Sequence, residues 1–152
     1  FARLPKKQER EFEKLVADRW NKALDSGAGS CLFRDNKLSG IVADSLTFFH
    51  GSRGWTGDYV VMPNHVHVLL TPIAGNELED ILQSVKSFTS NKINQITGSE
   101  GSLWQRESYD HIVRDAGQLV AFQMYIRSNP AKSGLKEGEY RMSDERCYEI
   151  LK

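Results

Sequence analysis

Residues 59–70 read YVVMPNHVHVLL, and this stretch decides the fold. The apolar residues before Pro63 and after Asn64 form two short runs rich in valine, a composition typical of β-strands. The proline and asparagine between the runs predict either a bent strand or a tight antiparallel pair. Because successive side chains of a strand point to opposite faces, His65 and His67 would share one face and the intervening valines the other.

Two imidazoles on one strand face form half of a divalent-metal site. Two familiar histidine patterns do not continue here. After His67 the chain lacks the acid of HxHxDH metal sites, and Leu69 stands where alternating-histidine nucleotide hydrolases have a third histidine. The pair alone is therefore as compatible with two packed or surface histidines as with a metal site.

Helical and extended patterns alternate around this stretch. The spacing of apolar residues predicts helices over residues 5–24, 41–50, 78–96 and 116–128. Asp115 is the expected N-cap of the last helix, and the dipeptide Asn129-Pro130 is its expected stop. Residues 51–57 read as a loop, residues 103–114 as an extended segment, and the tail after Leu135 as weakly structured.

The composition fits one globular domain, which we expect to span residues 1–152. Twenty basic and twenty acidic side chains cancel, so DNA binding would depend on local basic patches rather than on net charge. Two cysteines without CxxC spacing predict reduced thiols in a cytoplasmic protein. No apolar run has transmembrane length, so we expect no membrane partner.

The segment FQMYIRSNP at residues 122–130 carries a second candidate constellation. Tyr125 and Asn129 are four residues apart, so on a helix their side chains lie on one face, one turn from each other. A phenol and an amide oxygen could then point at the same ion or phosphate. The alternative is structural, with Tyr125 in an amphipathic core and Asn129 as a C-cap before proline.

Together, five blocks of the chain resemble the single-tyrosine HUH transposases, and most closely the REP-associated tyrosine transposases of bacteria. The blocks are VMPNHVHVL, SVKSFT, LWQ, YDHIVR and YIRSNPAKSGL, at residues 61–69, 84–89, 103–105, 109–114 and 125–135. Their order and spacing fit that family over nearly the whole chain. The asparagine at position 129 resembles the REP-associated branch, because the insertion-sequence branch commonly has a glutamine there.

This resemblance implies a fold and a site. The fold would be α+β, a ferredoxin-like sandwich of the HUH nuclease type, with an antiparallel sheet and helices on one face. His65 and His67 would bind the metal, Asn129 would complete the protein ligands, and Tyr125 would be the nucleophile. The family usually has a strand before its first long helix, and we expect that strand to lie upstream of Phe1 or to be lost.

The implied activity is that of a metal-dependent endonuclease and strand transferase in DNA transposition and recombination. It would act on single-stranded or hairpin DNA through a covalent 5′-phosphotyrosine. A phenol with a pKa of about 10 is a poor nucleophile at neutral pH, and a divalent ion can polarise the phosphate and favour the phenolate. A site without a carboxylate favours weakly held Mg²⁺ or Mn²⁺ over structural Zn²⁺. The family implies a monomer or a homodimer in the bacterial cytoplasm, associated with the nucleoid.

The residues that would contact DNA are harder to place. Lys86 could meet a phosphate, and Trp104 could either stack on an unpaired base or anchor the core. Weaker candidates are Arg53, Arg114, Arg127 and Lys132. Tyr109 is the rival nucleophile, although it lies in an extended stretch with no amide one turn away.

Two other functions stay open. One is a domesticated relative that binds hairpin DNA without cleaving it. The other is a metal-dependent phosphoesterase that acts on small nucleotides through water. A covalent DNA adduct would separate the transposase-like enzyme from both.

Overall fold

The computed structural model describes residues 31–105 and 110–143. The elements in chain order are η1 (Leu32–Arg34), α2 (Asn36–Phe48), β1 (Gly54–Val61), β2 (Val66–Pro72), α3 (Leu78–Thr97), α4 (Ala116–Lys132) and β3 (Arg141–Met142). The strands form an antiparallel sheet in the order β2-β1-β3. The helix expected over residues 5–24 lies outside the described residues.

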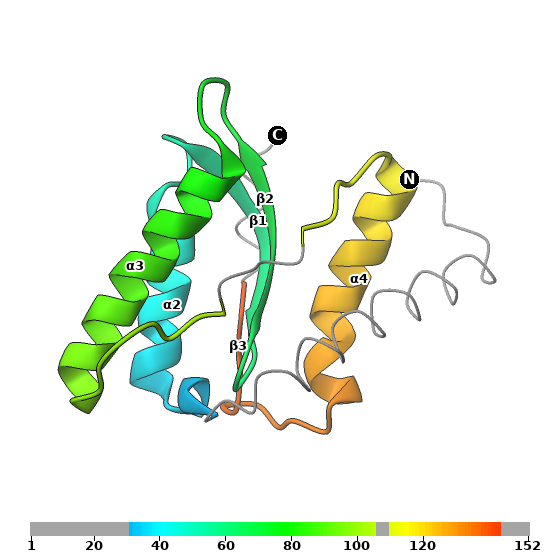
Figure 1. Ribbon diagram of the computed structural model, residues 1–152. Coiled ribbons are helices and arrows are strands. Elements are labelled where there is room, and N and C mark those ends of the chain that lie inside the picture. Colours follow the sequence, from blue (N-terminus) through cyan, green and yellow to red (C-terminus); the bar gives the residue numbers. More distant parts are fainter. Residues whose placement is uncertain (1–30, 106–109, 144–152) are drawn as a thin grey trace.

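The α+β class and the antiparallel sheet confirm the expected fold class. Helices α2 and α3 cover one face of the sheet as expected, whereas α4 lies on the opposite face (Figure 1). The alternation of β1 explains this second layer, because Val61 packs into the core with α2 and α3. Its neighbours Val60 and Met62 point the other way and pack with Ile126 of α4. A strand that is buried on both faces needs a cover on each.

Strands β1 and β2 form a tight hairpin, as the antiparallel alternative predicted. The register pairs Val60 with His67 and Val61 with Val66. The backbone N–H of Met62 donates to the carbonyl of His65 at 2.8 Å and closes the turn. The turn is therefore the Pro-Asn dipeptide, and it places the histidines at the start of β2.

Strand β1 begins earlier than the sequence predicts, so the expectation of a loop over residues 51–57 is wrong from Gly54 onward. The glycine there serves packing rather than a turn. A Cβ at Gly54 would lie 3.2 Å from the carbonyl oxygen of Thr71 and 3.3 Å from Cδ1 of Ile81. The sequence pattern of a glycine-rich loop thus hides a strand that lies close to its neighbours.

Strand β1 also contains a β-bulge between Thr56 and Tyr59. Thr56 faces α2, because its hydroxyl donates to a carbonyl of that helix at 2.7 Å. Asp58 is two residues further on, yet it faces α4. Residues two apart in a regular strand share a face, so the bulge is what transfers Asp58 to the other side of the sheet.

Helix α4 starts where predicted and continues further. Asp115 is its N-cap, and the carboxylate accepts the backbone N–H three residues on at 2.8 Å. The predicted stop is wrong, because the helix continues through Pro130 to Lys132. It ends in a Schellman motif, in which the N–H of Leu135 donates to the carbonyl of Pro130 at 2.9 Å and Gly134 has a φ of 71°. Leu135 then packs against the sheet beside Ile126.

The tail after Leu135 is more ordered than expected up to residue 143, because long-range contacts hold it. Strand β3 pairs with Val60 and Val61 at the edge of β1. The guanidinium of Arg141 donates to the hydroxyl of Ser39 at 3.3 Å and to the carbonyl of Asn36 at 3.0 Å. No helix in the described ranges is long and apolar enough to span a membrane.

Candidate active site

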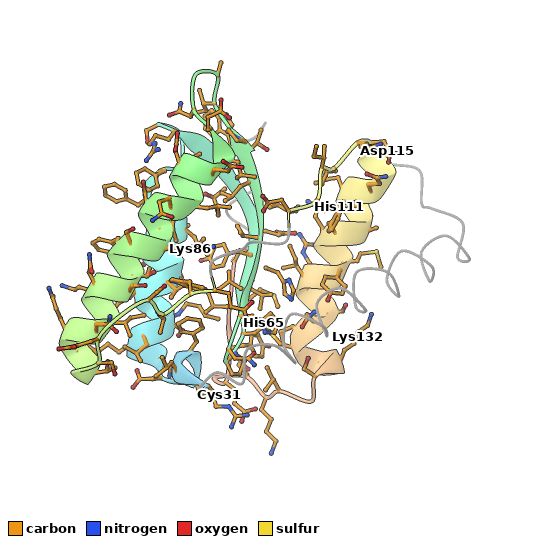
Figure 2. The ribbon with its side chains drawn as sticks, viewed as in Figure 1. Cys31, His65, Lys86, His111, Asp115 and Lys132 are labelled. Atoms are coloured by element: carbon orange, nitrogen blue, oxygen red, sulfur yellow. The ribbon has the colours of Figure 1, made fainter. Side chains whose placement is uncertain are left out.

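His65 and His67 share one face of the hairpin, as the strand alternation predicted. It is the face that α4 covers, because His67 packs against Tyr125 and His65 lies between the sheet and α4 (Figure 2). Their Nε2 atoms are 3.0 Å apart and their rings are nearly perpendicular, at 84°. Two nitrogens that bind one ion at about 2.1 Å and at right angles lie about 3.0 Å from each other. The spacing of the two imidazoles therefore fits two adjacent ligands of a single metal ion.

Burial lowers the pKa of both imidazoles. Desolvation, reinforced by the neighbouring His65, lowers the pKa of His67 to about 3. Desolvation lowers the pKa of His65 to about 4. Both rings are therefore neutral at pH 7, which is the form that offers a nitrogen lone pair to a metal ion.

Asn64 orients the first of these rings. Its Oδ1 lies 2.7 Å from Nδ1 of His65. Because an amide oxygen can only accept, Nδ1 carries the proton and Nε2 keeps its lone pair on the side of His67. Sequence reasoning treated Asn64 only as a turn residue. The signal that would have found it is an acceptor side chain directly before the first histidine.

Tyr125 lies against the second histidine. The ring centroids of Tyr125 and His67 are 5.3 Å apart, with an edge-on angle of 82°. The tyrosine is 8% exposed, and its phenol forms a hydrogen bond with the side chain of Asn129 one turn along α4. Burial raises the pKa of Tyr125 above its usual value, and the hydrogen bond with Asn129 partly opposes that rise. The structure thus connects the two histidines, the tyrosine and the asparagine through successive contacts.

The structural alternative for Asn129 is wrong, because α4 continues past it and Asn129 is not a C-cap. The side chains that could bind a metal ion at this site are few. Within residues 31–105 and 110–143, no group of three or more histidine, cysteine or acidic side chains could hold a metal ion. A metal at this site would depend on His65, His67 and neutral oxygens such as the Asn129 amide. That donor set fits a weakly held divalent ion better than a closed zinc site.

Two predicted DNA contacts lie on the α3 side of the sheet. Lys86 belongs to α3 itself (Figure 2), and Trp104 contacts Thr89 of that helix. The ammonium of Lys86 donates to the carbonyl of Gln105 at 3.3 Å. The indole N–H of Trp104 donates to the hydroxyl of Thr89 at 2.8 Å, and its ring packs 5.3 Å from that of Phe33. These contacts attach the segment after α3 to the core, which favours the anchoring alternative for Trp104. Base stacking by Trp104 stays a prediction.

The other predicted contacts lie elsewhere. Arg114, Arg127 and Lys132 belong to α4 or to the residues just before it. The guanidinium of Arg53 lies 4.7 Å from the ring of Phe49, near the end of β1 that is remote from the hairpin turn. Tyr109 lies outside the described residues.

Asp58 is a residue that sequence reasoning missed. Its side chain is 2% exposed, and its Oδ2 lies 3.4 Å from Nε of Arg127 on α4. A lone aspartate beside Gly57 reads as a turn residue, because neither the bulge nor the partner on a distant helix leaves a local pattern.

The family model described as "Transposase IS200 like" matches residues 56–129. This range starts in β1 and ends at Asn129, so it contains both histidines and Tyr125. No curated protein and no solved structure gives a significant match. Residues 56–129 of the chain are therefore similar to IS200-like transposases.

Proposed function

We propose that the protein is a metal-dependent endonuclease and strand transferase that acts on single-stranded or hairpin DNA with Tyr125 as its nucleophile. One observation carries this proposal. The phenol of Tyr125, hydrogen-bonded to Asn129, lies against His67, whose Nε2 converges with that of His65. The match to IS200-like transposases supports a DNA-processing role. We further propose the REP-associated branch, because of Asn129, and action on chromosomal DNA in the bacterial cytoplasm.

His65, His67 and Asn129 would hold Mg²⁺ or Mn²⁺, which when bound would polarise the scissile phosphate and offset the charge that develops on it. The protein's own side chains do the rest. Asn64 fixes the tautomer of His65, and Asn129 holds the phenol of Tyr125 in place. Because burial raises the pKa of this phenol, it is neutral at pH 7 until substrate binds.

The phenol oxygen of Tyr125 attacks the phosphorus, and the bond from phosphorus to the 3′-oxygen of the preceding nucleotide breaks. The products are a 5′-phosphotyrosine and a free 3′-hydroxyl, on which the phenol proton ends. The energy of the phosphodiester is kept in the covalent bond, so the strand can be rejoined without ATP. This reaction is a transesterification rather than a hydrolysis.

A covalent-adduct assay tests the proposal. Labelled single-stranded hairpin oligonucleotides from the genomic neighbourhood of the gene are incubated with the protein and Mn²⁺ or Mg²⁺, then run on a denaturing gel. We expect an adduct that is lost in Tyr125→Phe and in EDTA. Tyr140→Phe is the matched control, since Tyr140 packs against the apolar cluster beneath α4 and should retain the adduct.

Other outcomes would replace the proposal. An adduct that persists in Tyr125→Phe would move the nucleophile to another tyrosine, with Tyr109 tested first. Tight hairpin binding without any adduct would identify a DNA-binding relative that does not cleave. Hydrolysis of small nucleotides without an adduct would identify a phosphoesterase.

A further inference from the structure

An ion pair joins the sheet to the helix that carries Tyr125. Oδ2 of Asp58 on β1 lies 3.4 Å from Nε of Arg127 on α4. The aspartate side chain is almost fully buried, whereas 51% of the arginine side chain is exposed. Oδ2 accepts no hydrogen bond from any residue in the described part of the chain. In the described part of the chain, the guanidinium of Arg127 is the cation that meets this buried carboxylate.

The bulge in β1 makes this pairing specific. Without the extra residue, Asp58 would share the face of Thr56 and point toward α2. With it, the carboxylate faces α4. A buried carboxylate is costly unless a cation meets it, so the arrangement with Arg127 close to Asp58 is favoured over a helix that has slid or rotated away.

Among residues 31–105 and 110–143, the apolar attachment of α4 to the sheet is small, so the ion pair is a substantial part of the contact described there. The buried residues of α4 are Tyr125, Ile126 and Pro130. The apolar cluster beneath it has three buried members, whereas the cluster on the opposite face has eight. Arg127 and Tyr125 are two residues apart on α4. An interaction that fixes the position of Arg127 therefore also fixes where Tyr125 lies along the helix axis and how the helix is rotated about that axis.

We propose that Asp58 is a positioning residue, whose ion pair with Arg127 holds α4 against the sheet so that Tyr125 stays beside His67. The catalytic consequence rests on the proposed function, but the docking of α4 does not. The pairing also separates two roles for Arg127. A DNA contact needs only the charge of Arg127, whereas docking needs both partners.

Kinetics with four variants test the proposal: Asp58→Asn, Arg127→Gln, the double variant and Arg127→Lys. Single-turnover cleavage is measured at saturating hairpin DNA. We expect each of the two neutral variants to slow cleavage about ten- to hundredfold, because a small displacement of the nucleophile has effects of that size. The double variant should be no slower than the single ones, and Arg127→Lys should restore most of the rate. Asp44→Asn, which removes an exposed acid of α2, is the matched control.

A second readout needs no DNA. With 3-fluorotyrosine at position 125, the wild-type protein should give one ¹⁹F resonance that reports the buried ring. Asp58→Asn and Arg127→Gln should each shift or split it, and Arg127→Lys should restore it. Arg127 is half exposed, so its variants keep the test available if Asp58→Asn does not fold.

The outcomes are distinct. An unchanged ¹⁹F signal in Asp58→Asn and Arg127→Gln, with DNA affinity lost only in Arg127→Gln, would make Arg127 a DNA contact and overturn the proposal. A changed ¹⁹F signal in a protein that cleaves no DNA would uphold the docking role while the proposed function fails.

Discussion

His67 links the stability of the fold to pH. In the folded protein its pKa is about 3, against an ordinary value near 6.5, so below pH 6.5 the unfolded chain binds a proton that the folded one does not. Its contribution is fully present above pH 6.5 and is lost as the pH falls toward the folded pKa. We expect the metal-free protein to lose about 2 kcal/mol from this residue between pH 7 and 5, measured by urea unfolding in EDTA. His67→Gln should show a shallower pH dependence, and equal slopes would contradict this account.

Asn64 should control the affinity for metal without touching the ion. Asn64→Ala removes the acceptor from Nδ1 of His65, so the proton is no longer held on Nδ1 and Nε2 is no longer kept unprotonated. We expect Mn²⁺ to bind about tenfold or more weakly, measured by titration calorimetry. Asn76→Ala is the control, because Asn76 supports a different loop through the carbonyl of Ile73. Equal Mn²⁺ affinity in the wild type and Asn64→Ala would exclude this orienting role.

At the scale of the elements, Gly57 lies in the bulge of β1, where the strand passes close to β2. A Cβ at Gly57 would lie 3.3 Å from Cβ of Leu69 on β2, and neither atom can move without the strands. We expect Gly57→Ala to destabilise the protein by about 1 kcal/mol or more in urea unfolding. Gly40→Ala in α2 should instead be neutral or stabilising, because the nearest atom to its Cβ would be a guanidinium nitrogen of Arg141 at the ordinary contact distance of 3.4 Å. If Gly57→Ala also proved neutral or stabilising, the close approach of β1 to Leu69 would not be what requires glycine at position 57.

Local patterns predicted α3, the start of α4 and the hairpin, because apolar periodicity, a cap and a turn dipeptide are read within a few residues. Local patterns did not predict the boundaries that depend on contacts between residues far apart in the sequence. The early part of β1 depends on the fit of Gly54 against Thr71 and Ile81, and the end of α4 depends on Leu135 packing on the sheet.

In the candidate site, too, local patterns predicted some contacts and missed one that depends on a distant element. The two-residue period of a strand predicted that His65 and His67 lie side by side, and the four-residue spacing on a helix predicted the same for Tyr125 and Asn129. The ion pair of Asp58 with Arg127 could not be predicted, because it requires both a bulge in β1 and a partner on another element.

At the scale of the whole molecule, metal should stabilise the fold, because its expected ligands come from both β2 and α4. A ligand that binds only the folded chain adds about 2.7 kcal/mol at one hundred times its dissociation constant. We expect the melting temperature to rise with Mn²⁺ concentration in a thermal-shift titration, and the rise to vanish in His67→Gln. An equal rise in that variant would place the ion elsewhere.

The unequal packing of the two faces of the sheet also affects how the molecule fluctuates. Helices α2 and α3 share the larger apolar cluster, so their amides should exchange with solvent deuterium only in rare, nearly global opening events. In the described part of the chain, helix α4 rests on the smaller apolar cluster, and we expect its amides to exchange through partial opening at lower free energy. The nucleophile would then travel with the part of the molecule that detaches first, which would let a bulky strand enter and leave while the rest of the domain stays folded.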